Sequence, residues 1–139
     1  MPKKSESTPK TVPESEKLTI NLGYVDLGRI DLLVAEGFYA NRSDFIRTAI
    51  RSRLDSHGEA ITHVVARKML VLGVQNLSRA DLETSRAAGE KLQIRVLGLA
   101  CIAADVTPEL ALESIESITV LGALHASNAV RAALADRIL

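Results

Sequence analysis

Polar side chains occupy every second position of the segment "KLTINL": these are Lys17, Thr19 and Asn21. The positions between them are apolar and hold Leu18, Ile20 and Leu22. Side chains two residues apart lie on the same face of a β-strand, so the segment 17–22 predicts a strand with one polar and one apolar face. An ammonium, a hydroxyl and a carboxamide in one row can form hydrogen bonds with a polar partner laid along the strand. A merely solvated strand face is the alternative.

Two helices are predicted after this strand. In "VDLGRIDLLVAEGF" the apolar residues recur at helical spacing, and Gly37 supplies a stop. In "YANRSDFIRTAIRSRLDSHG" Asn41 and Ser43 are good N-cap residues, an apolar stripe follows them, and Gly58 ends the pattern. The predicted order is therefore strand, helix, helix.

One strand and two short helices, about forty residues, bury too little surface to be stable alone, so a partner chain is expected to complete the core. Antiparallel pairing of two such strands across a two-fold axis would turn the apolar residues towards the helices and leave the polar residues facing out. A two-stranded ribbon of this kind fits the major groove of B-DNA, where amide, hydroxyl and ammonium groups meet base edges.

With these features, residues 16–57 resemble the ribbon-helix-helix family of DNA-binding proteins, which includes MetJ, Arc and the CopG-like repressors. The resemblance rests on "KLTINL", on the helix-Gly-helix spacing and on the polar opening "NRSDFIRTAI" of the second helix. It implies an obligate dimer whose paired strands enter the major groove, with base contacts from Lys17, Thr19 and Asn21. It also implies that a DNA phosphate is held at the N-terminal end of the second helix, which here consists of Asn41, Arg42 and Ser43. Free amides and the helix dipole favour an anion there, with plain capping and solvation as the alternative.

Composition divides the chain into three segments. Residues 1–16 are rich in Pro, Ser, Thr and mixed charge and predict a disordered tail, residues 17–58 form the ribbon-helix-helix domain, and residues 59–139 form a second domain. Arg47 and Arg51, four residues apart in the predicted second helix, are expected to lie on a solvated face, with Arg51 paired to Asp55.

The second domain contains a repeat. The triplet V-L-G recurs with its glycine at Gly73, Gly98 and Gly122, each time in a β-prone run followed by a helix start at Ser78, Thr107 or Ser127. One strand and one helix per unit predict parallel strands that stack in a small, solenoid-like β/α domain. The overall fold class is therefore α+β. Residues 60–68 fit either a strand or a helix.

Stacking in register would align Asn76, Cys101 and His125, each three residues after a repeat glycine. Cys and His can ligate metals, but the chain has one Cys and three scattered His, which is sparse for a metal site. A structural ladder is the favoured interpretation, and neither a metal nor a cofactor is predicted.

Composition also argues against several classes of protein. The formal net charge is zero, so any anion binding must come from a local arrangement. The single cysteine lacks the pattern of a secreted disulfide scaffold, and no apolar stretch is long enough to span a bilayer. A cytoplasmic, nucleoid-associated protein without a membrane partner is therefore expected. The common hydrolase, nucleotide-binding and metalloprotease motifs do not occur, so an enzyme is not expected.

These observations predict a sequence-specific DNA-binding transcriptional regulator, a repressor, that binds double-stranded DNA as a homodimer. Open apolar strand edges at both ends of the repeat predict further self-assembly through residues 59–139. Two alternatives stay open. One is an antitoxin that represses its own operon and binds a toxin protein through its second half, and the other is a DNA-anchored structural polymer that organises the nucleoid.

Overall fold

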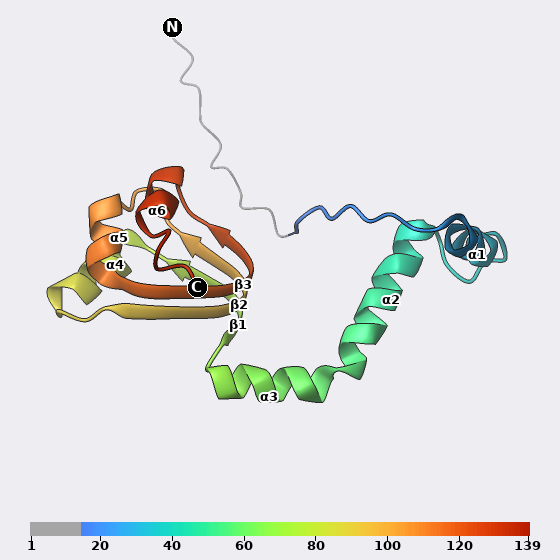
Figure 1. The fold of residues 1–139 in the computed structure, drawn as a ribbon, viewed down its shortest axis with the longest axis horizontal. Helices are drawn as coiled ribbons and strands as arrows, with labels where there is room; N and C mark the ends of the chain where they lie inside the picture. The colour runs from blue at the N-terminus through green and yellow to red at the C-terminus, as the bar shows by residue number, and fades with distance from the viewer. Residues whose placement is uncertain (1–14) are drawn as a thin grey trace, which may run out of the picture. The chain divides into compact units, whose positions relative to one another are not determined.

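The computed structural model describes residues 15–139, so the predicted tail 1–16 lies outside this range except for its last residues. The chain divides into two compact units, one that ends at Ser56 and one that spans His57–Leu139 (Figure 1). The sequence analysis placed the boundary slightly later, at residue 58. Within residues 15–139, every helix falls short of the length and apolar character that crossing a lipid bilayer requires.

The first unit contains two helices, α1 (Tyr24–Ala35) and α2 (Arg42–Ser56), preceded by a segment without regular structure. Residues 17–22 form no β-strand in the single chain, contrary to the prediction from the sequence. The physical reason is that a strand is defined by its ladder of hydrogen bonds, and the strands within residues 15–139 pair only with one another in the second unit.

A tightly hydrogen-bonded corner joins the two helices. The N–H groups of Gly37 and the following residue donate to the carbonyls of Val34 and Leu33 at 3.1 and 3.0 Å, which is the Schellman arrangement that ends a helix. The rings of Tyr39 and Phe45 then pack edge to face, with centroids 5.0 Å apart. These contacts fix the direction in which the chain enters α2.

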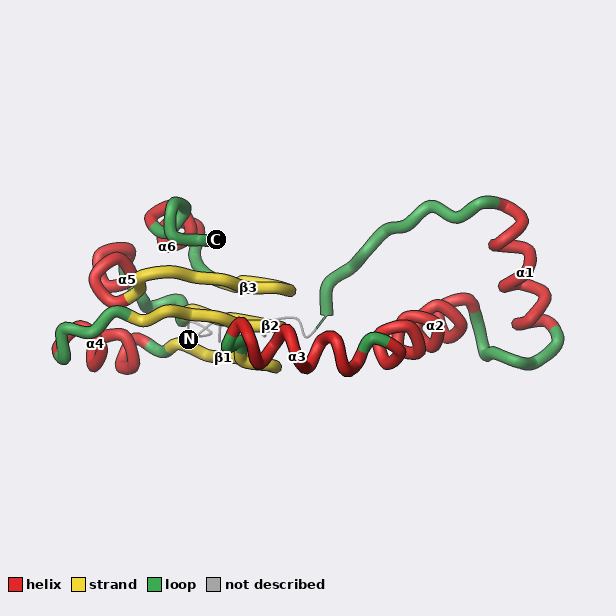
Figure 2. The backbone as a smooth tube through the Cα atoms, turned by 60° about the horizontal axis from the view of Figure 1, so that its bottom comes forward, coloured by secondary structure: helices red, strands yellow, loops and turns green. Residues whose placement is uncertain are grey.

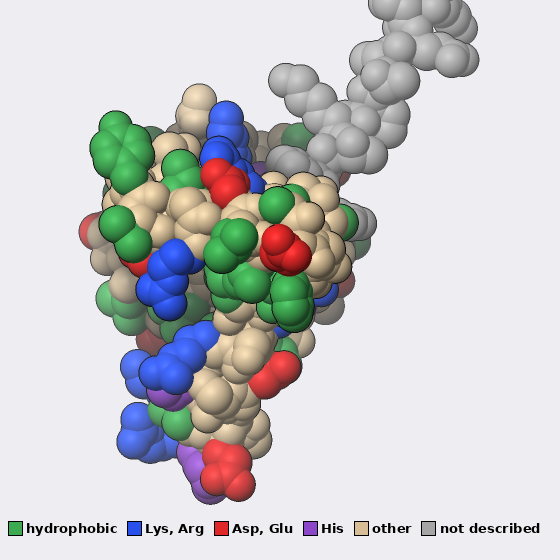
Figure 3. All heavy atoms as spheres, turned by 90° about the vertical axis from the view of Figure 1, so that its right-hand side faces the viewer, with side chains coloured by type: hydrophobic (Ala, Val, Ile, Leu, Met, Phe, Trp, Pro, Cys, Tyr) green, Lys and Arg blue, Asp and Glu red, His purple; other side chains and the backbone are tan. Residues whose placement is uncertain are grey.

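The first unit has almost no core of its own. Among the hydrophobic residues of the range 15–56, Ile30 alone is buried. Large apolar side chains are exposed instead: Leu18, Ile20, Leu22, Tyr24, Val25, Leu32, Phe38, Ile50 and Leu54. Figure 3 shows a face of the molecule on which hydrophobic side chains are exposed next to basic side chains. A unit of this size with so little buried apolar surface is not stable by itself.

The second unit begins with helix α3 (Gly58–Lys68), so the segment 60–68, which fitted either a strand or a helix, is helical. Gly58, expected to end α2, is instead the first residue of α3. Strands and helices then alternate: β1 (Val71–Leu77), α4 (Arg79–Ala87), β2 (Leu92–Ile102), α5 (Pro108–Ser114), β3 (Ile115–His125) and α6 (Asn128–Ala133). The three strands form one parallel sheet in the order β1-β2-β3, in which Gly73, Gly98 and Gly122 are direct neighbours. The V-L-G triplets therefore stack in register, as their repetition predicted.

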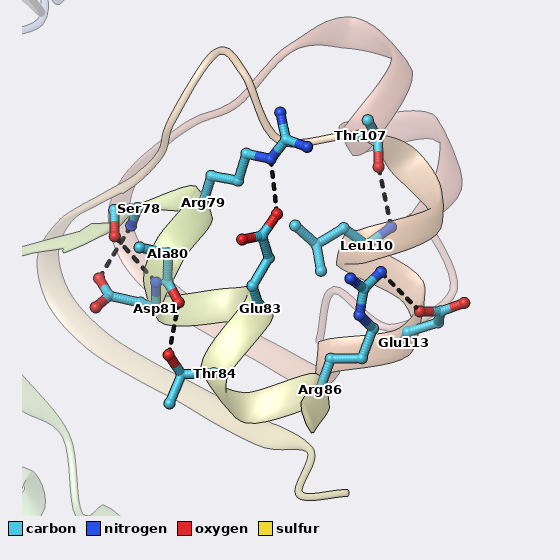
Figure 4. Close-up of polar contacts among 10 residues, drawn as sticks. All are labelled: Ser78, Arg79, Ala80, Asp81, Glu83, Thr84, Arg86, Thr107, Leu110 and Glu113. Atoms are coloured by element: carbon cyan, nitrogen blue, oxygen red, sulfur yellow. Dashed lines mark hydrogen bonds and ion pairs between the residues drawn. The ribbon is translucent and has the colours of Figure 1, made fainter. Parts of the chain in front are cut away.

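Each helix that follows a strand begins at a hydroxyl residue. The side chains of Ser78, Thr107 and Ser127 accept hydrogen bonds from the backbone N–H three residues further on, at 3.1, 3.2 and 3.2 Å. Ser78 and Asp81 complete a capping box, because the Asp81 carboxylate accepts the Ser78 N–H at 3.1 Å (Figure 4). Hydrogen bonds from Ser78 lower the pKa of Asp81. The predicted helix starts are confirmed by these caps.

Strand and helix together form one coil per repeat. Figure 1 shows β2 and β3 bending near their middle and running back towards the helices, and Figure 2 shows the coils stacked in chain order. The salt bridge between Arg86 of α4 and Glu113 of α5, at 3.2 Å, joins adjacent helices. The interior between strands and helices is apolar and includes Leu77, Leu82, Ile94, Val96, Ala100, Ile102, Leu110, Ile115, Ile118, Val130 and Leu134.

A column of glycines sets the approach of successive coils. Gly73, Gly98 and Gly122 have φ angles of 120°, 137° and 122°, which L side chains rarely adopt. A Cβ atom on Gly98 would overlap the carbonyl oxygen of Gly73, and one on Gly122 would overlap the carbonyl oxygen of Gly98. The Cα atom of one glycine thus faces the carbonyl of the glycine before it, so a side chain at position 98 or 122 would force the strands apart.

Candidate nucleic-acid interface

The predicted base-contact residues are all exposed in the single chain: Lys17, Thr19 and Asn21. The apolar residues that alternate with them are exposed as well, to 83% for Leu18, 61% for Ile20 and 40% for Leu22. Aliphatic side chains at alternate positions of a β-prone segment are normally buried on one face of a sheet. The segment 17–22 therefore has the composition of a strand whose apolar face is still uncovered.

Asn41 caps the N-terminus of α2. Its Oδ1 atom accepts a hydrogen bond from the Asp44 N–H at 2.8 Å, and the Asp44 carboxylate accepts the Ala40 N–H at 3.0 Å. The backbone N–H groups of Arg42 and Ser43 have no acceptor within residues 15–139. Two free donors at the positive end of a helix dipole can bind an anion such as a phosphate oxygen. The structure thus brings the three predicted phosphate-contact residues to one helix end and gives Asn41 a capping role there.

The Arg42 side chain is held by Asp31 of α1. Its Nε and Nη2 atoms donate to Oδ1 and Oδ2 of Asp31 at 2.7 and 2.8 Å, a bidentate pair that connects the two helices. The side-chain hydrogen bonds of this pair lower the pKa of Asp31 and raise that of Arg42. Nη1 of Arg42 forms no hydrogen bond within residues 15–139, so one edge of the guanidinium is oriented and still able to donate. Sequence analysis did not identify Asp31, because a pair between two different helices leaves no periodic signal.

Two further arginines lie along α2 on the same side as Ser43. Arg47 and Arg51 follow Ser43 at a spacing of four residues, so the three side chains share one side of the helix. Both arginines are exposed, and neither is in a salt bridge with another residue of the described chain. The expected pair between Arg51 and Asp55 does not form within that part of the chain. Sequence analysis treated Arg47 and Arg51 as a solvated face. The four-residue spacing of these arginines from Ser43 would have indicated that they share a side of the helix with it.

In the second unit, Asn76, Cys101 and His125 are direct neighbours across the sheet, as the repeat alignment predicted. Asn76 is exposed, and Cys101 and His125 are half-buried. Residues 15–139 contain no group of three or more His, Cys, Asp or Glu side chains placed to hold a metal ion.

Two short helices joined at a capped corner, after an alternating segment that needs a second strand, are the parts of a ribbon-helix-helix DNA-binding protein. The sequence pattern of the Ribbon-Helix-Helix transcriptional regulator family matches residues 13–131. Because this match covers most of the chain, the protein belongs to that family and is a DNA-binding transcriptional regulator. No curated protein and no solved structure matches the chain.

The extent of the family match corrects one expectation from the sequence. The resemblance was assigned to residues 16–57 only, whereas the family pattern continues through the β/α unit as far as α6. The N-terminal segment carried the more familiar motif, and the second unit showed only its internal repeat. The family pattern therefore includes most of the second unit.

Proposed function

We propose that the protein binds DNA as a homodimer in which the two 17–22 segments pair antiparallel and enter the major groove as a ribbon. The observation that carries the proposal is the uncovered row of Leu18, Ile20 and Leu22 in a unit that buries Ile30 and little else. Burying an aliphatic side chain contributes about 1.5–3 kcal/mol, so three per chain supply on the order of 10 kcal/mol to a dimer before strand ordering is counted. Because this burial is available only in the dimer, folding of the first unit and dimerisation are proposed to be one event.

In this ribbon the polar row faces the base edges. The carboxamide of Asn21 matches the donor and acceptor pair of adenine, and the Lys17 ammonium matches the acceptors of guanine. The Thr19 hydroxyl can donate or accept, and its methyl group can contact that of thymine. These three side chains are the proposed determinants of sequence preference.

Phosphate contacts are proposed at the N-terminus of α2. The donors proposed for the anion are the N–H groups of Arg42 and Ser43 and the Nη1 of Arg42, all without an acceptor within residues 15–139, and Asn41 caps the helix end that presents the N–H groups. Arg47 and Arg51 would then lie along the same phosphate backbone. Such contacts position the dimer on DNA without reading its sequence.

We propose that the protein acts as a repressor, because a dimer seated in the groove excludes other proteins from the same site. For the second unit we propose self-assembly in a solenoid-like stack that links bound dimers. The antitoxin alternative calls for a segment that folds on a toxin, whereas the second unit already has its own closed core. A DNA-anchored polymer would use the same assembly surfaces and differs in lacking specific sites on DNA.

Sequencing of bound DNA tests this proposal. The purified full chain is incubated with sheared DNA of its own host at near-physiological salt, and the bound fraction is sequenced. We expect enrichment of a few sites that share a short symmetric or tandem motif. The Asn21→Ala variant should lose the enrichment, whereas Asn128→Ala, which truncates an exposed asparagine of α6, should keep it. Uniform recovery of all fragments by the unmodified protein would refute specific regulation and favour the polymer.

A further inference from the structure

The outer edge of β3 is occupied over part of its length. Within residues 15–139 its only backbone partner outside the sheet is an isolated parallel bridge between Ile118 and Ile138, where the Leu139 N–H also donates to the Ile118 carbonyl at 2.8 Å. The Arg131 side chain of α6 donates to the Leu124 carbonyl at 3.0 Å, a hydrogen bond that an added strand would replace. The remainder of this edge, Val120 to His125, has no strand beside it in the described chain. A row of backbone N–H and C=O groups on such an edge is a template for another strand.

The strand at the opposite end of the sheet has nearly the same length and the matching register. β1 starts at Val71, which pairs with Val96, and Val96 pairs in turn with Val120. The position of Val71 is thus the repeat equivalent of Val120, where the free part of the β3 edge begins. A second β1 would fit along this free part, immediately after the bridge to Ile138, without displacing it.

The glycine column is open at the β1 end. The Cα of Gly98 faces the carbonyl of Gly73, and the Cα of Gly122 faces the carbonyl of Gly98. Gly73 has the same positive φ, yet no atom lies within 4 Å of its Cβ position. By the same repeat, the Gly122 carbonyl is directed away from β2. The β1 end of the column therefore presents a Cα atom without a carbonyl beside it, and the β3 end presents a carbonyl without a glycine Cα beside it.

The strand residues of both edges lack the charged residues and the Pro that usually prevent strand addition, and the Arg131 side chain, which comes from α6, is the charged group that reaches the β3 edge within residues 15–139. Natural edge strands are commonly protected by Lys, by Pro or by a bulge, but β1 reads "VLGVQNL" and the free part of β3 reads "VLGALH", without a Lys, an Arg or a Pro. Apolar side chains at these edges are exposed, to 70% for Leu72, 63% for Val74 and 52% for Leu121. Both edges are thus suited to burial against a partner of the same chemistry.

We propose that this partner is a second copy of the same chain, which docks head to tail by adding its β1, parallel and in register, to β3 of the first copy. Gly73 of one copy then lies beside Gly122 of the next, and the glycine column continues across the contact. The inference specifies the contact behind the assembly role proposed for the second unit, and it is independent of the DNA contacts. Because the contact joins two different edges, an assembly that does not close into a ring keeps a free edge of each kind and can grow.

Cysteine cross-linking tests the pairing and its direction. By extension of the register Val74–Leu99–Ala123, Val74 of one copy should lie directly opposite Ala123 of the next. Neighbouring strands place such residues within the distance that a disulfide spans. In a background in which the native cysteine is removed by Cys101→Ala, full-length Val74→Cys and Ala123→Cys variants are oxidised separately and as a mixture. We expect a cross-linked pair of chains in the mixture and only background levels in either variant alone.

Three outcomes would overturn the proposal. Cross-linking of the Val74→Cys variant with itself would show that the β1 edges pair antiparallel with each other. Equal cross-linking when Asn76→Cys replaces Val74→Cys in the mixture would show that no register is kept, since Asn76 lies two residues further along β1. The absence of any cross-link in the mixture would refute strand addition, and if the unmodified protein also sediments only as a dimer, the assembly role itself fails.

A glycine substitution provides an independent test. Gly73→Ala places a methyl group where the Gly122 carbonyl of the next copy would lie, while inside one chain it meets no neighbour. Gly89→Ala is the matched control, because Gly89 also has a positive φ and open space but lies outside the strands. We expect Gly73→Ala to sediment as a dimer at concentrations at which Gly89→Ala and the unmodified protein form larger species. Unchanged assembly of Gly73→Ala would contradict the proposed contact, whether or not specific DNA binding is found.

Discussion

The Gly98→Ala substitution should destabilise the second unit strongly and leave the first unit unchanged. The new methyl group would overlap the Gly73 carbonyl oxygen and lie 3.0 Å from its carbonyl carbon, so β1 and β2 would have to separate at the Gly73–Gly98 pair of their ladder. A non-glycine residue at φ 137° adds backbone strain of about 1–3 kcal/mol. Overpacking adds about 1–3 kcal/mol more. A loss of about 2–6 kcal/mol is a large fraction of the 5–15 kcal/mol that is typical of a domain.

Two spectroscopic probes separate the units in this experiment. The chain has no tryptophan, and its two tyrosines, Tyr24 and Tyr39, both lie in the first unit. Tyrosine fluorescence therefore follows the first unit, whereas far-ultraviolet circular dichroism follows both. In urea titrations at low protein concentration, Gly98→Ala should shift the dichroism transition to lower denaturant and leave the fluorescence transition in place.

Gly89→Ala is the control for this prediction as well. It has φ 69° and no atom within 4 Å of its Cβ position, so it reports strain alone, about 1–2 kcal/mol. The difference between the two variants therefore contains the close approach of the glycine column together with the extra backbone strain at φ 137°. Equal shifts for Gly98→Ala and Gly89→Ala would refute the reasoning that the carbonyl contact excludes a side chain at position 98.

Three further predictions concern the first unit. Ile20→Ala should weaken the dimer by about 2–5 kcal/mol per chain, seen as a concentration-dependent loss of helical dichroism; an unchanged dissociation constant would contradict burial of this side chain. Asn21→Ala should reduce the preference for the operator over random duplex by about 1–3 kcal/mol in a titration followed by fluorescence anisotropy. Ser43→Pro removes a backbone N–H donor at the start of α2, so in the same titration it should weaken binding to both duplexes alike. The hydrogen bonds with Arg42 lower the pKa of Asp31 in the folded protein. The pair therefore stabilises the folded first unit at pH values above the ordinary pKa of 3.8, and this stabilisation is lost as the pH falls through the lower pKa of the folded state. In the Asp31→Asn variant, the urea midpoint followed by tyrosine fluorescence should no longer fall at acidic pH for this reason. An identical dependence of the midpoint on pH in both proteins would show that the pair has no such role.

Features that depend on local chemistry could be predicted from the sequence. The positive φ angle of all three column glycines favours glycine, and the close carbonyl contact at Gly98 and Gly122 excludes a side chain there. The repeat at Gly73, Gly98 and Gly122 was therefore visible without a structure. The hydroxyl caps were equally visible, because a side-chain acceptor at the first turn is the direct partner of a free backbone N–H. Both signals lie within a few residues of the element that they define.

Features that depend on distant parts of the chain could not be predicted in the same way. Helix α3 has no side-chain cap at His57 and ends at Met69 in the left-handed conformation, with φ 54°, where a glycine would have marked the end. The bidentate pair of Asp31 and Arg42 joins two helices whose relative placement depends on the corner between them. The strand at 17–22 is an extreme case, since its hydrogen-bond partner is expected in another chain.

The low net charge of the chain suggests why self-assembly would help the protein to bind DNA. Formal net charge is zero, and the cations proposed to meet phosphate are confined to α2, so one dimer has few contacts with the DNA backbone and a correspondingly modest electrostatic affinity. A head-to-tail contact between second units would place the next dimer at high effective concentration over the neighbouring stretch of DNA. Affinity would then come from the number of linked dimers instead of from the charge of each one. Tandem operator sites would be favoured over isolated ones for the same reason, because only they let linked dimers keep every base contact.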